Sequence, residues 1–460
     1  MFLSIESSHN TIIKDDSGNN ISYAEAVDFI ETMKRSKIPR CLIFCLCENT
    51  AGSLLGYLAF ENNGQVPLLL NAKLDNDLRN KLDLTYRPSF YWAPQEVASS
   101  IDGEVVFSAY NYVMKKTKWQ PYPLNKKLSL LLPTSGTTGS PKLVRHKYGN
   151  LEANAFNVAK VFQWTEKERG ICNLQMHYTM GLNVINSYIA AKSTVLLCKK
   201  NLMDPELWDF IKEEQGTSIC GVPFSYEVMR RIAVDKMDLP ELRVFAEGGG
   251  KLTDKMFSWW NNYCKESGKA FYATFGTTET SARMSCLTPD HTTEKIGSIG
   301  KAIPGGELFI VNEIEDEKGF TVGELGYRGP NVTMGYAICK EDLLKGDDFN
   351  GEYHTGDIAK RDQDGFYYIV GRKGRFLKLF GLRISLEETE RILNEKYDSE
   401  YICTGNDKQM IIYTTDEKNK DDVIPFISNK TGIMKTMFKI KVIDEIPRNE
   451  NGKVLYSEMK

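Results

Sequence analysis

Short apolar runs alternate with helical stretches along the first half of the chain. Residues 40–46 form one apolar run, residues 50–61 are apolar and rich in small side chains, and residues 66–70 form a second run. A run of four to eight apolar residues indicates a buried strand. Strand, helix and strand at this spacing are typical of a βαβ unit, so the pattern predicts a parallel sheet covered by helices.

Helix starts and later elements can be placed in the same way. Ser22 followed by Glu25 is typical of a capping box at the start of a helix. Helices are also expected over residues 150–162 and 387–397. Residues 400–446 alternate strand and helix, which indicates a small α+β region at the end of the chain. The pattern as a whole predicts the α/β class.

Composition and charge exclude several other classes. The chain has 460 residues, 42% hydrophobic and 26% charged, which is ordinary for globular proteins. A net charge of −3 gives no overall basic field for nucleic acid. Neither a signal peptide nor an apolar run long enough to span a membrane is visible. We therefore expect a cytoplasmic protein without stable membrane insertion.

Cysteine and histidine usage argues against a metal centre built on these residues. The ten cysteines are scattered without zinc-ligand spacing, and the five histidines are not clustered. Without an export signal, the cysteines are expected to be reduced thiols.

The most informative stretch follows the apolar run 128–132. Pro133 ends that run, residues 134–139 are all small, and Lys142 follows. Backbone N–H groups in such a loop can form an anion-binding concavity, and a lysine adds a point charge suited to phosphate. The stretch is not a Walker A loop, because Pro141 stands where its second glycine would be. It predicts a triphosphate cradle, with an ordinary surface turn as the alternative.

Residues 135–142, Ser-Gly-Thr-Thr-Gly-Ser-Pro-Lys, resemble the phosphate loop of the adenylate-forming (AMP-binding) superfamily. That superfamily includes acyl- and aryl-CoA synthetases, peptide-synthetase adenylation domains and luciferase. Other stretches resemble its remaining motifs in the same order, over nearly the whole chain: residues 22–26, 51–70, 176–182, 275–279, 323–336, 355–357, 371–388 and 447–453.

The resemblance implies a set of nucleotide-binding residues. It assigns ATP phosphates to the loop, adenine to the glycines near residue 249 and to the ring of Phe275, and the ribose hydroxyls to Asp357. The implied residues are Thr134, Ser135, Gly136, Thr137, Thr138, Gly139, Lys142, Gly249, Phe275, Gly276, Thr277, Asp357 and Arg372.

The resemblance also implies four catalytic side chains. Thr278 would bond the α-phosphate, Glu279 would hold Mg²⁺, Lys453 would reach the substrate carboxylate and the α-phosphate, and His177 would border the acyl pocket. Taken alone, each residue has a simpler interpretation. Thr278 and Glu279 suit a helix start, His177 could be an ordinary buried histidine, and Lys453 a solvated side chain beside a hairpin turn.

The domain organisation is likewise implied by the resemblance. It predicts a large N-terminal ATP- and acyl-binding domain, residues 1–372, of parallel-rich sheets flanked by helices with a small β-barrel-like subdomain. Residues 373–460 would be a small mobile C-terminal α+β lid domain. Gly374 would be the hinge, where the superfamily usually has Asp or Lys, and Gly381 would border the thiol tunnel.

The implied activity is that of an AMP-forming acid–thiol ligase. ATP and Mg²⁺ would convert a small-molecule carboxylate to acyl-AMP and pyrophosphate, and CoA or the phosphopantetheine of an acyl carrier protein would accept the acyl group. Activation of an amino or hydroxy acid for carrier-protein loading is an alternative. The absence of a carboxylate between Ile171 and Lys192 opposes the amino acid, because a buried ammonium group needs a counter-charge. A non-catalytic nucleotide-binding homologue is the alternative from another class.

Overall fold

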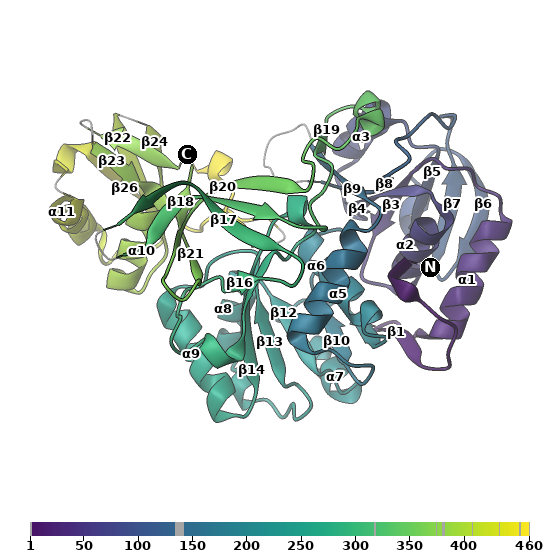
Figure 1. The fold of residues 1–460 in the computed structure, drawn as a ribbon, viewed down its shortest axis with the longest axis horizontal. Coiled ribbons are helices and arrows are strands. Elements are labelled where there is room, and N and C mark those ends of the chain that lie inside the picture. The colour runs from purple at the N-terminus through teal and green to yellow at the C-terminus, as the bar shows by residue number, and fades with distance from the viewer. Residues whose placement is uncertain are drawn as a thin grey trace.

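The computed structural model describes residues 2–133, 142–316, 319–373, 375–379, 382–406, 408–431, 433–449 and 452–459. The chain forms two large mixed sheets, a smaller antiparallel sheet and a C-terminal α+β unit (Figure 1). The helices are α1 (Tyr23–Arg35), α2 (Ala51–Asn63), α3 (Asn76–Tyr86), α4 (Gln95–Ala98), α5 (Asn150–Phe162), α6 (Thr179–Ala190), α7 (Pro205–Glu213), α8 (Pro223–Arg231), α9 (Asp254–Glu266), α10 (Leu386–Tyr397) and α11 (Lys420–Thr431).

The first large sheet contains the predicted βαβ unit. Strands β3 and β4 are parallel, with Leu42 opposite Val66, and α2 connects them. Ser22 caps α1 through the predicted capping box with Glu25. The strand order is β19 (Tyr336–Ala337), β9 (Leu143–Lys147), β8 (Leu128–Pro133), β4 (Val66–Asn71), β3 (Leu42–Cys47), β5 (Phe90–Pro94), β7 (Tyr112–Lys116) and β6 (Glu104–Ala109).

The second large sheet places five parallel strands, β11, β10, β12, β13 and β14, side by side. Helices α1, α2, α5 and α6 share one apolar core between the two sheets, and α7, α8 and α9 cover the outer face. The strand order is β16 (Lys301–Ala302), β15 (Ser285–Leu287), β14 (Ala270–Phe275), β13 (Val244–Glu247), β12 (Ser218–Gly221), β10 (Arg169–Cys172), β11 (Thr194–Leu197), β1 (Thr11–Asp15) and β2 (Asn20–Ser22).

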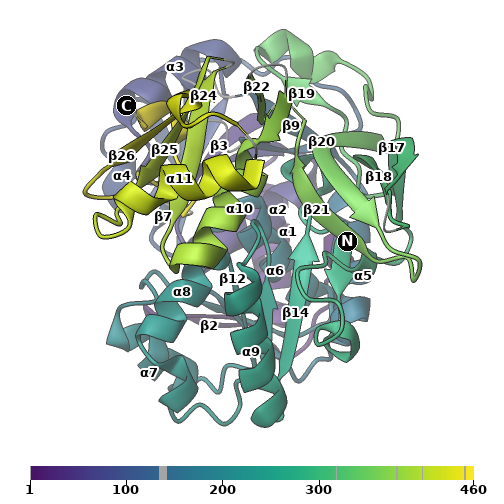
Figure 2. The same cartoon turned by 90° about the vertical axis from the view of Figure 1, so that its left-hand side faces the viewer.

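The two smaller units complete the predicted α/β organisation. An antiparallel sheet of β17 (Glu307–Glu315), β18 (Thr321–Arg328), β20 (Glu352–Arg361) and β21 (Tyr367–Arg372) stands where the barrel-like subdomain was expected. The C-terminal unit has its own apolar core beneath α10 and α11. Its strands are β22 (Phe376–Leu379), β23 (Leu382–Ser385), β24 (Tyr401–Asn406), β25 (Gln409–Thr414) and β26 (Phe438–Val442), and it lies beside α8 and α9 (Figure 2).

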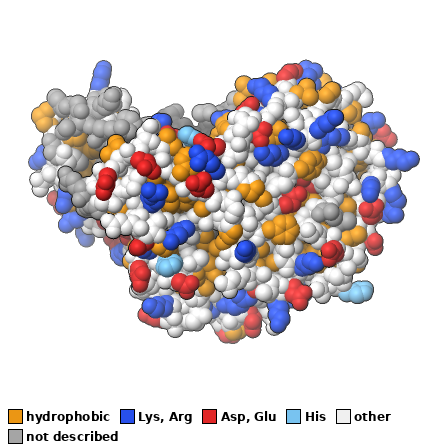
Figure 3. Space-filling view, viewed as in Figure 1, with side chains coloured by type: hydrophobic (Ala, Val, Ile, Leu, Met, Phe, Trp, Pro, Cys, Tyr) orange, Lys and Arg blue, Asp and Glu red, His pale blue; other side chains and the backbone are white. Residues whose placement is uncertain are grey.

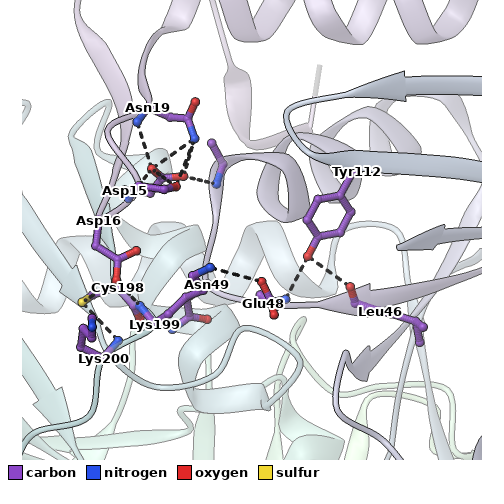
Figure 4. Close-up of polar contacts among 12 residues, drawn as sticks. Asp15, Asp16, Asn19, Leu46, Glu48, Asn49, Tyr112, Cys198, Lys199 and Lys200 are labelled. Atoms are coloured by element: carbon purple, nitrogen blue, oxygen red, sulfur yellow. Dashed lines mark hydrogen bonds and ion pairs between the residues drawn. The ribbon is translucent and has the colours of Figure 1, made fainter. Parts of the chain in front are cut away.

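Buried polar side chains tie the two large sheets together (Figure 4). Asp15 accepts a hydrogen bond from the backbone N–H of Ala51, at the start of α2, over 2.9 Å. Asn49 donates to the carbonyl oxygens of Cys172 and Leu174, each over 3.0 Å. It also accepts a bond from the N–H of Met176 over 3.0 Å. Asn49 therefore fixes the segment that leads directly into His177 and α6.

The surface and the thiols agree with the expectations from composition. Acidic and basic side chains are interspersed over the face seen in Figure 3, without a field of one sign. All ten cysteines are free thiols, and Cys339 alone among them is not fully buried. Within the described residues, no helix is long and apolar enough to cross a membrane.

Candidate active site

Several predicted site residues, among them Gly249, Phe275 and Glu279, lie at or just after the carboxyl ends of β13 and β14. Ligands of open α/β sheets commonly bind at this edge. A Cβ added to Gly248, just after β13, would lie 2.5 Å from the hydroxyl oxygen of Thr274 and 2.6 Å from the terminal carbon of Met180. A side chain at position 248 would therefore not fit, because the end of β13 packs closely against β14 and α6.

The turn after β14 holds Thr278 and Glu279. The hydroxyl of Thr179, the first residue of α6, donates to the Thr278 hydroxyl over 2.9 Å. The backbone carbonyl of Glu279 accepts from the N–H of Thr333 over 3.0 Å. Gly276 makes this turn possible, because a Cβ there would overlap the carbonyl oxygen of Ala282. Thr277 closes the turn through its carbonyl, which accepts from the N–H of Thr280 over 3.1 Å.

Tyr336 connects Glu279 to the phosphate loop. Its hydroxyl donates to Oε1 of Glu279 over 2.7 Å. The ammonium nitrogen of Lys142 lies 3.2 Å from the centre of the Tyr336 ring. In the sequence, Tyr336 only ends the motif-like stretch 323–336, and its place beside Glu279 was not predicted because 57 residues separate the two positions.

Asp357 and Arg372 form the sugar side of the predicted nucleotide site. Arg372 Nε donates to Oδ1 of Asp357 over 3.0 Å, across the neighbouring strands β20 and β21. Burial raises the pKa of Asp357, and the guanidinium of Arg372 opposes that shift. The backbone N–H of Asp357 donates to the hydroxyl of Thr355 over 3.0 Å, which fixes the turn.

Lys453 reaches this site from the C-terminal unit. Its ammonium nitrogen lies 5.7 Å from the centre of the Tyr178 ring, at the start of α6. Burial lowers the pKa of Lys453, the charge of Arg372 lowers it further, and the charge of Glu279 raises it. Lys453, Arg372 and Glu279 therefore interact electrostatically although they come from three separate parts of the chain.

His177 lies against the same helix start. Its side chain is 9% exposed, and its Nδ1 has no hydrogen-bond partner among the described residues. Burial lowers the pKa of His177 to about 4, so the ring is neutral at pH 7. Beside it, Gly249 has a φ of +81°, and a Cβ there would lie 3.4 Å from the Tyr178 hydroxyl. Phe275 ends β14 and packs against the core of the four-stranded sheet.

Several predicted site residues cannot be placed. The phosphate-loop positions, the hinge Gly374 and the tunnel residue Gly381 lie outside the described residues, and their roles stay predictions. These loop positions are Thr134, Ser135, Gly136, Thr137, Thr138 and Gly139.

The acidic residues present fit a magnesium ion that accompanies ATP better than a resident metal centre. The described residues contain no group of three or more His, Cys, Asp or Glu side chains that could hold a metal ion. Mg²⁺ keeps several waters and usually takes one or two carboxylates together with substrate phosphates. Glu279, held in place by Tyr336 near Lys142, is suited to be that carboxylate.

Fold and geometry together define an α/β protein in which the predicted nucleotide-site residues Asp357, Glu279 and Lys453 lie where a large sheet, the four-stranded sheet and the small C-terminal unit meet. The AMP-binding enzyme profile matches residues 71–337. The chain therefore belongs to the AMP-binding enzyme family, as the motifs predicted.

Relatives and solved structures extend this assignment. A 2-succinylbenzoate–CoA ligase of Bacillus cereus is 28% identical over 340 residues, covering 72% of this chain and 69% of the relative. The o-succinylbenzoate CoA synthetase (MenE) of Bacillus subtilis with its acyl-adenylate intermediate has a TM-score of 0.77 at 20% identity, covering 98% of this chain and 95% of the other. The same synthetase with ATP and magnesium gives 0.76 at 21%, covering 98% and 96%. The predicted fold class is confirmed, and the predicted class of AMP-forming acid–thiol ligase agrees with these names.

Proposed function

We propose that the chain activates a carboxylic acid with ATP, forming acyl-AMP and pyrophosphate, and then transfers the acyl group to the thiol of CoA. The observation that carries the proposal is the position of Lys453. It brings a partly buried positive charge from the C-terminal unit to Tyr178, within electrostatic reach of Glu279 and Arg372. The names of the CoA ligase relatives support CoA as acceptor.

Charge explains why the first step needs this arrangement. The attacking carboxylate and the α-phosphate are both anions, so they repel each other until positive groups hold them together. Lys453 would bind the carboxylate and an α-phosphate oxygen at once, and the Thr278 hydroxyl would donate to the same phosphate. Mg²⁺, when bound, would neutralise phosphate charge beside Glu279.

The remaining site residues would position the nucleotide. Asp357 would accept hydrogen bonds from the ribose hydroxyls, with Arg372 holding its orientation. Adenine would lie between Phe275 and the backbone near Gly249, with Gly276 and Thr277 shaping the turn. The loop from Thr134 to Lys142 would bind the phosphates. His177, Val222 and Gly248 would border the acyl group, in a region where a neutral histidine suits an apolar substrate.

The second step requires Lys453 to leave. We propose that residues 1–372 and 373–460 act as two domains and that the smaller one rotates at Gly374 after adenylation. A glycine can absorb a large backbone change at such a hinge. Rotation would withdraw Lys453 and bring the region of Gly381 to the thiol of CoA, which then attacks the mixed anhydride and releases AMP. ATP and CoA as substrates, together with ten free thiols, favour the cytoplasm.

The proposal is tested by exchange of labelled pyrophosphate into ATP in the presence of fatty, aryl, hydroxy, amino and dicarboxylic acids. Exchange that depends on one class of acid is expected. CoA should then release AMP and form a thioester, whereas an acyl carrier protein with phosphopantetheine should not. Thioester formation on the carrier alone would replace CoA as acceptor. ATP binding without exchange for any acid would contradict the proposed activity and favour a non-catalytic protein.

A further inference from the structure

Arg375 directly follows the predicted hinge residue and turns its side chain into the C-terminal unit. Its Nη2 donates to Oε1 of Glu390 on α10 over 2.7 Å and to the backbone carbonyl of Cys403 on β24 over 3.0 Å. The side chains of Arg375 and Glu390 are 22% and 12% exposed. A guanidinium paired with a carboxylate in this way is held in one plane, because its N–H groups form a rigid fork.

The same guanidinium group holds Tyr456, which lies 81 residues further along the chain. Nη1 of Arg375 donates to the Tyr456 hydroxyl over 2.7 Å, and the guanidinium carbon lies 4.3 Å from the centre of the Tyr456 ring. The ring is 40% exposed, so the core does not enclose it. The contact with Arg375 therefore ties the segment around Tyr456 to the segment beside the hinge.

The segment just before Tyr456 is a hairpin that carries Lys453. The N–H of Lys453 donates to Oδ1 of Asn449 over 2.9 Å. The N–H of Leu455 donates to the carbonyl of Pro447 over 2.8 Å. Both bonds lie within residues 447–455, so they fix the shape of the hairpin but not its position on the C-terminal unit.

Two side chains fix that position. Arg448 contacts Glu400 near the start of the hairpin. Tyr456 contacts Arg375 just after its end. Because Lys453 lies between these two contacts, loss of either one would let its ammonium group move relative to the nucleotide site.

Arg375 is also connected to the strand that carries the ribose-side residues. Helix α10 lies beside β21 (Figure 2). Nη1 of Arg375 donates to Oε1 of Glu387 over 3.4 Å, and a Cβ added to Gly371 on β21 would lie 3.1 Å from Oε2 of the same glutamate. The next residue, Arg372, holds Asp357. The support of the Lys453 hairpin and the nucleotide site therefore meet at α10.

We propose that Arg375 is a positioning residue for adenylation, which clamps Tyr456 so that the hairpin presents Lys453 to the nucleotide site. This inference rests on the proposed adenylation activity. Small displacements of a reacting group are costly, because the attacking carboxylate and the α-phosphate must be held in one geometry. Thioester formation does not use Lys453 in the proposed mechanism, so the clamp should matter for the first step only.

The first test removes the clamp at Tyr456, which leaves the ion pair between Arg375 and Glu390 in place. Tyr456→Ala should lower kcat of pyrophosphate exchange by about 30-fold and change KM for ATP by less than about threefold. Thioester formation from supplied acyl-AMP and CoA should stay within about threefold of wild type. Tyr456→Phe keeps the ring over the guanidinium group and loses one hydrogen bond, so a loss of about fivefold is expected.

Variants of Arg375 test whether the two side chains act together. Arg375→Met should lower the exchange rate by about 30-fold, and adding Tyr456→Ala to it should cost less than about threefold more. Arg375→Lys keeps the charge beside Glu390 but not the planar fork, so it should restore part of the rate. Equal loss of adenylation and thioester formation in Tyr456→Ala, or fully additive losses in the double variant, would overturn the proposal.

Two matched controls lie in the same unit. Arg391→Met removes an arginine of α10 that pairs with Glu388 and Glu395. Tyr397→Phe removes a hydroxyl that donates to the carbonyl of Asp422 over 3.2 Å. Both variants should leave the two half-reactions within about twofold of wild type, since exposed pairs and bonds contribute little. A loss in these controls as large as in the variants of Tyr456 and Arg375 would assign the effect to general destabilisation.

Amide hydrogen exchange separates this inference from the proposed activity, because it needs no substrate. Tyr456→Ala should accelerate exchange in residues 447–455 by about tenfold and leave that of α10 unchanged. If this occurs but wild-type protein exchanges pyrophosphate with no acid, the clamp stands and the proposed activity fails. If exchange in residues 447–455 is unchanged in both Tyr456→Ala and Arg375→Met, the inference is wrong even when adenylation is observed.

Discussion

Lys453 shows how a single side chain depends on its surroundings for its chemistry. On the surface a lysine would be a hydrated charge. In this structure burial lowers the pKa of Lys453. Its ammonium group lies beside the ring of Tyr178, where an anion would bind with little competition from water. The residue should therefore matter for the step in which two anions must meet.

Replacing Lys453 with Ala should remove the adenylation step selectively. We expect pyrophosphate exchange to fall by at least about 100-fold, because an electrostatic contact at the reacting atoms is lost. Thioester formation from supplied acyl-AMP and CoA should change by less than about threefold. Lys439→Ala, an exposed lysine on β26, is the matched control and should leave both steps unchanged.

The pH dependence of the same step has a definite sign. The pKa of Lys453 lies below its ordinary 10.5. Adenylation should therefore decline at a lower pH than the pH at which an exposed lysine loses its proton.

For the Lys453→Ala variant, equal loss of both half-reactions would contradict the assigned role.

At the scale of elements, the turn after β14 depends on a close backbone approach. A Cβ at Gly276 would overlap the carbonyl oxygen of Ala282, so Gly276→Ala must displace the turn that carries Thr278 and Glu279. We expect a loss of about 1–3 kcal/mol in the free energy of unfolding and about 100-fold in pyrophosphate exchange. Gly346, which has no atom within 4 Å of an added Cβ, provides the control. Gly346→Ala should change the free energy of unfolding by less than about 0.5 kcal/mol. Similar losses in the two variants would contradict a close backbone approach at Gly276.

Helix α10 contains a carboxyl group that should make stability depend on pH. Burial raises the pKa of Glu390 from 4.5 to about 7, against the opposing charge of Arg375 and the N–H of Cys403. The folded state therefore holds this proton more tightly than the unfolded state. The resulting stability is fully present below pH 4.5 and is lost as the pH rises through 7, by at most about 3 kcal/mol.

Denaturant unfolding between pH 4.5 and pH 8 measures this effect. Glu390→Gln should flatten the decline in the free energy of unfolding relative to wild type. Glu395→Gln, on the same helix with a side chain 42% exposed, should keep the wild-type slope. If Glu390→Gln and wild type lose stability in parallel, the carboxyl group does not titrate in this range.

At the scale of the whole molecule, the C-terminal unit is held against α8 beside the turn that precedes Lys453. A Cβ added to Gly452 would lie 2.9 Å from Cβ of Phe224, and the guanidinium carbon of Arg448 lies 5.7 Å from the Phe224 ring. Arg448 in turn donates to the carbonyl of Gly452 over 2.7 Å. Phe224 is 43% exposed although it is apolar, so this contact with the C-terminal unit covers the ring only in part.

Removal of this contact should weaken adenylation without affecting thioester formation. We expect Phe224→Ala to reduce pyrophosphate exchange by about tenfold, because the position of Lys453 becomes less defined. Asp398→Ala is the control, since it breaks an exposed ion pair with Lys255 that also joins the two units. Such pairs contribute at most about 1 kcal/mol, so we expect pyrophosphate exchange to change by less than about fivefold. A larger effect from Asp398→Ala than from Phe224→Ala would contradict this view of the interface.

Local patterns predicted much of the fold because they depend on neighbouring residues. The capping box at Ser22 and the helix over residues 150–162 are where the sequence placed them. The strand predicted over 40–46 begins and ends within two residues of β3. Motif order also predicted the family that the profile match then established. The assigned roles of the site residues remain predictions.

The sequence did not predict contacts between residues that are far apart along the chain. The contact of Tyr336 with Glu279 and the position of Arg283 beneath α6 were not predicted, because a motif or a single arginine does not show which distant residue it meets. An arginine between Ala282 and Met284 resembles many surface arginines until its burial and its neutral partners are known.

The sequence by itself determined the elements, the family and the kinds of side chain that ATP chemistry needs, since periodicity and motifs are encoded over short spans. Only the tertiary structure decided which of these side chains meet. It placed Lys453 against Tyr178 and enclosed Arg283 among neutral groups. Burial and the distances between strands and helices set the charge state and the partners of each group, and these quantities exist only once the chain has folded.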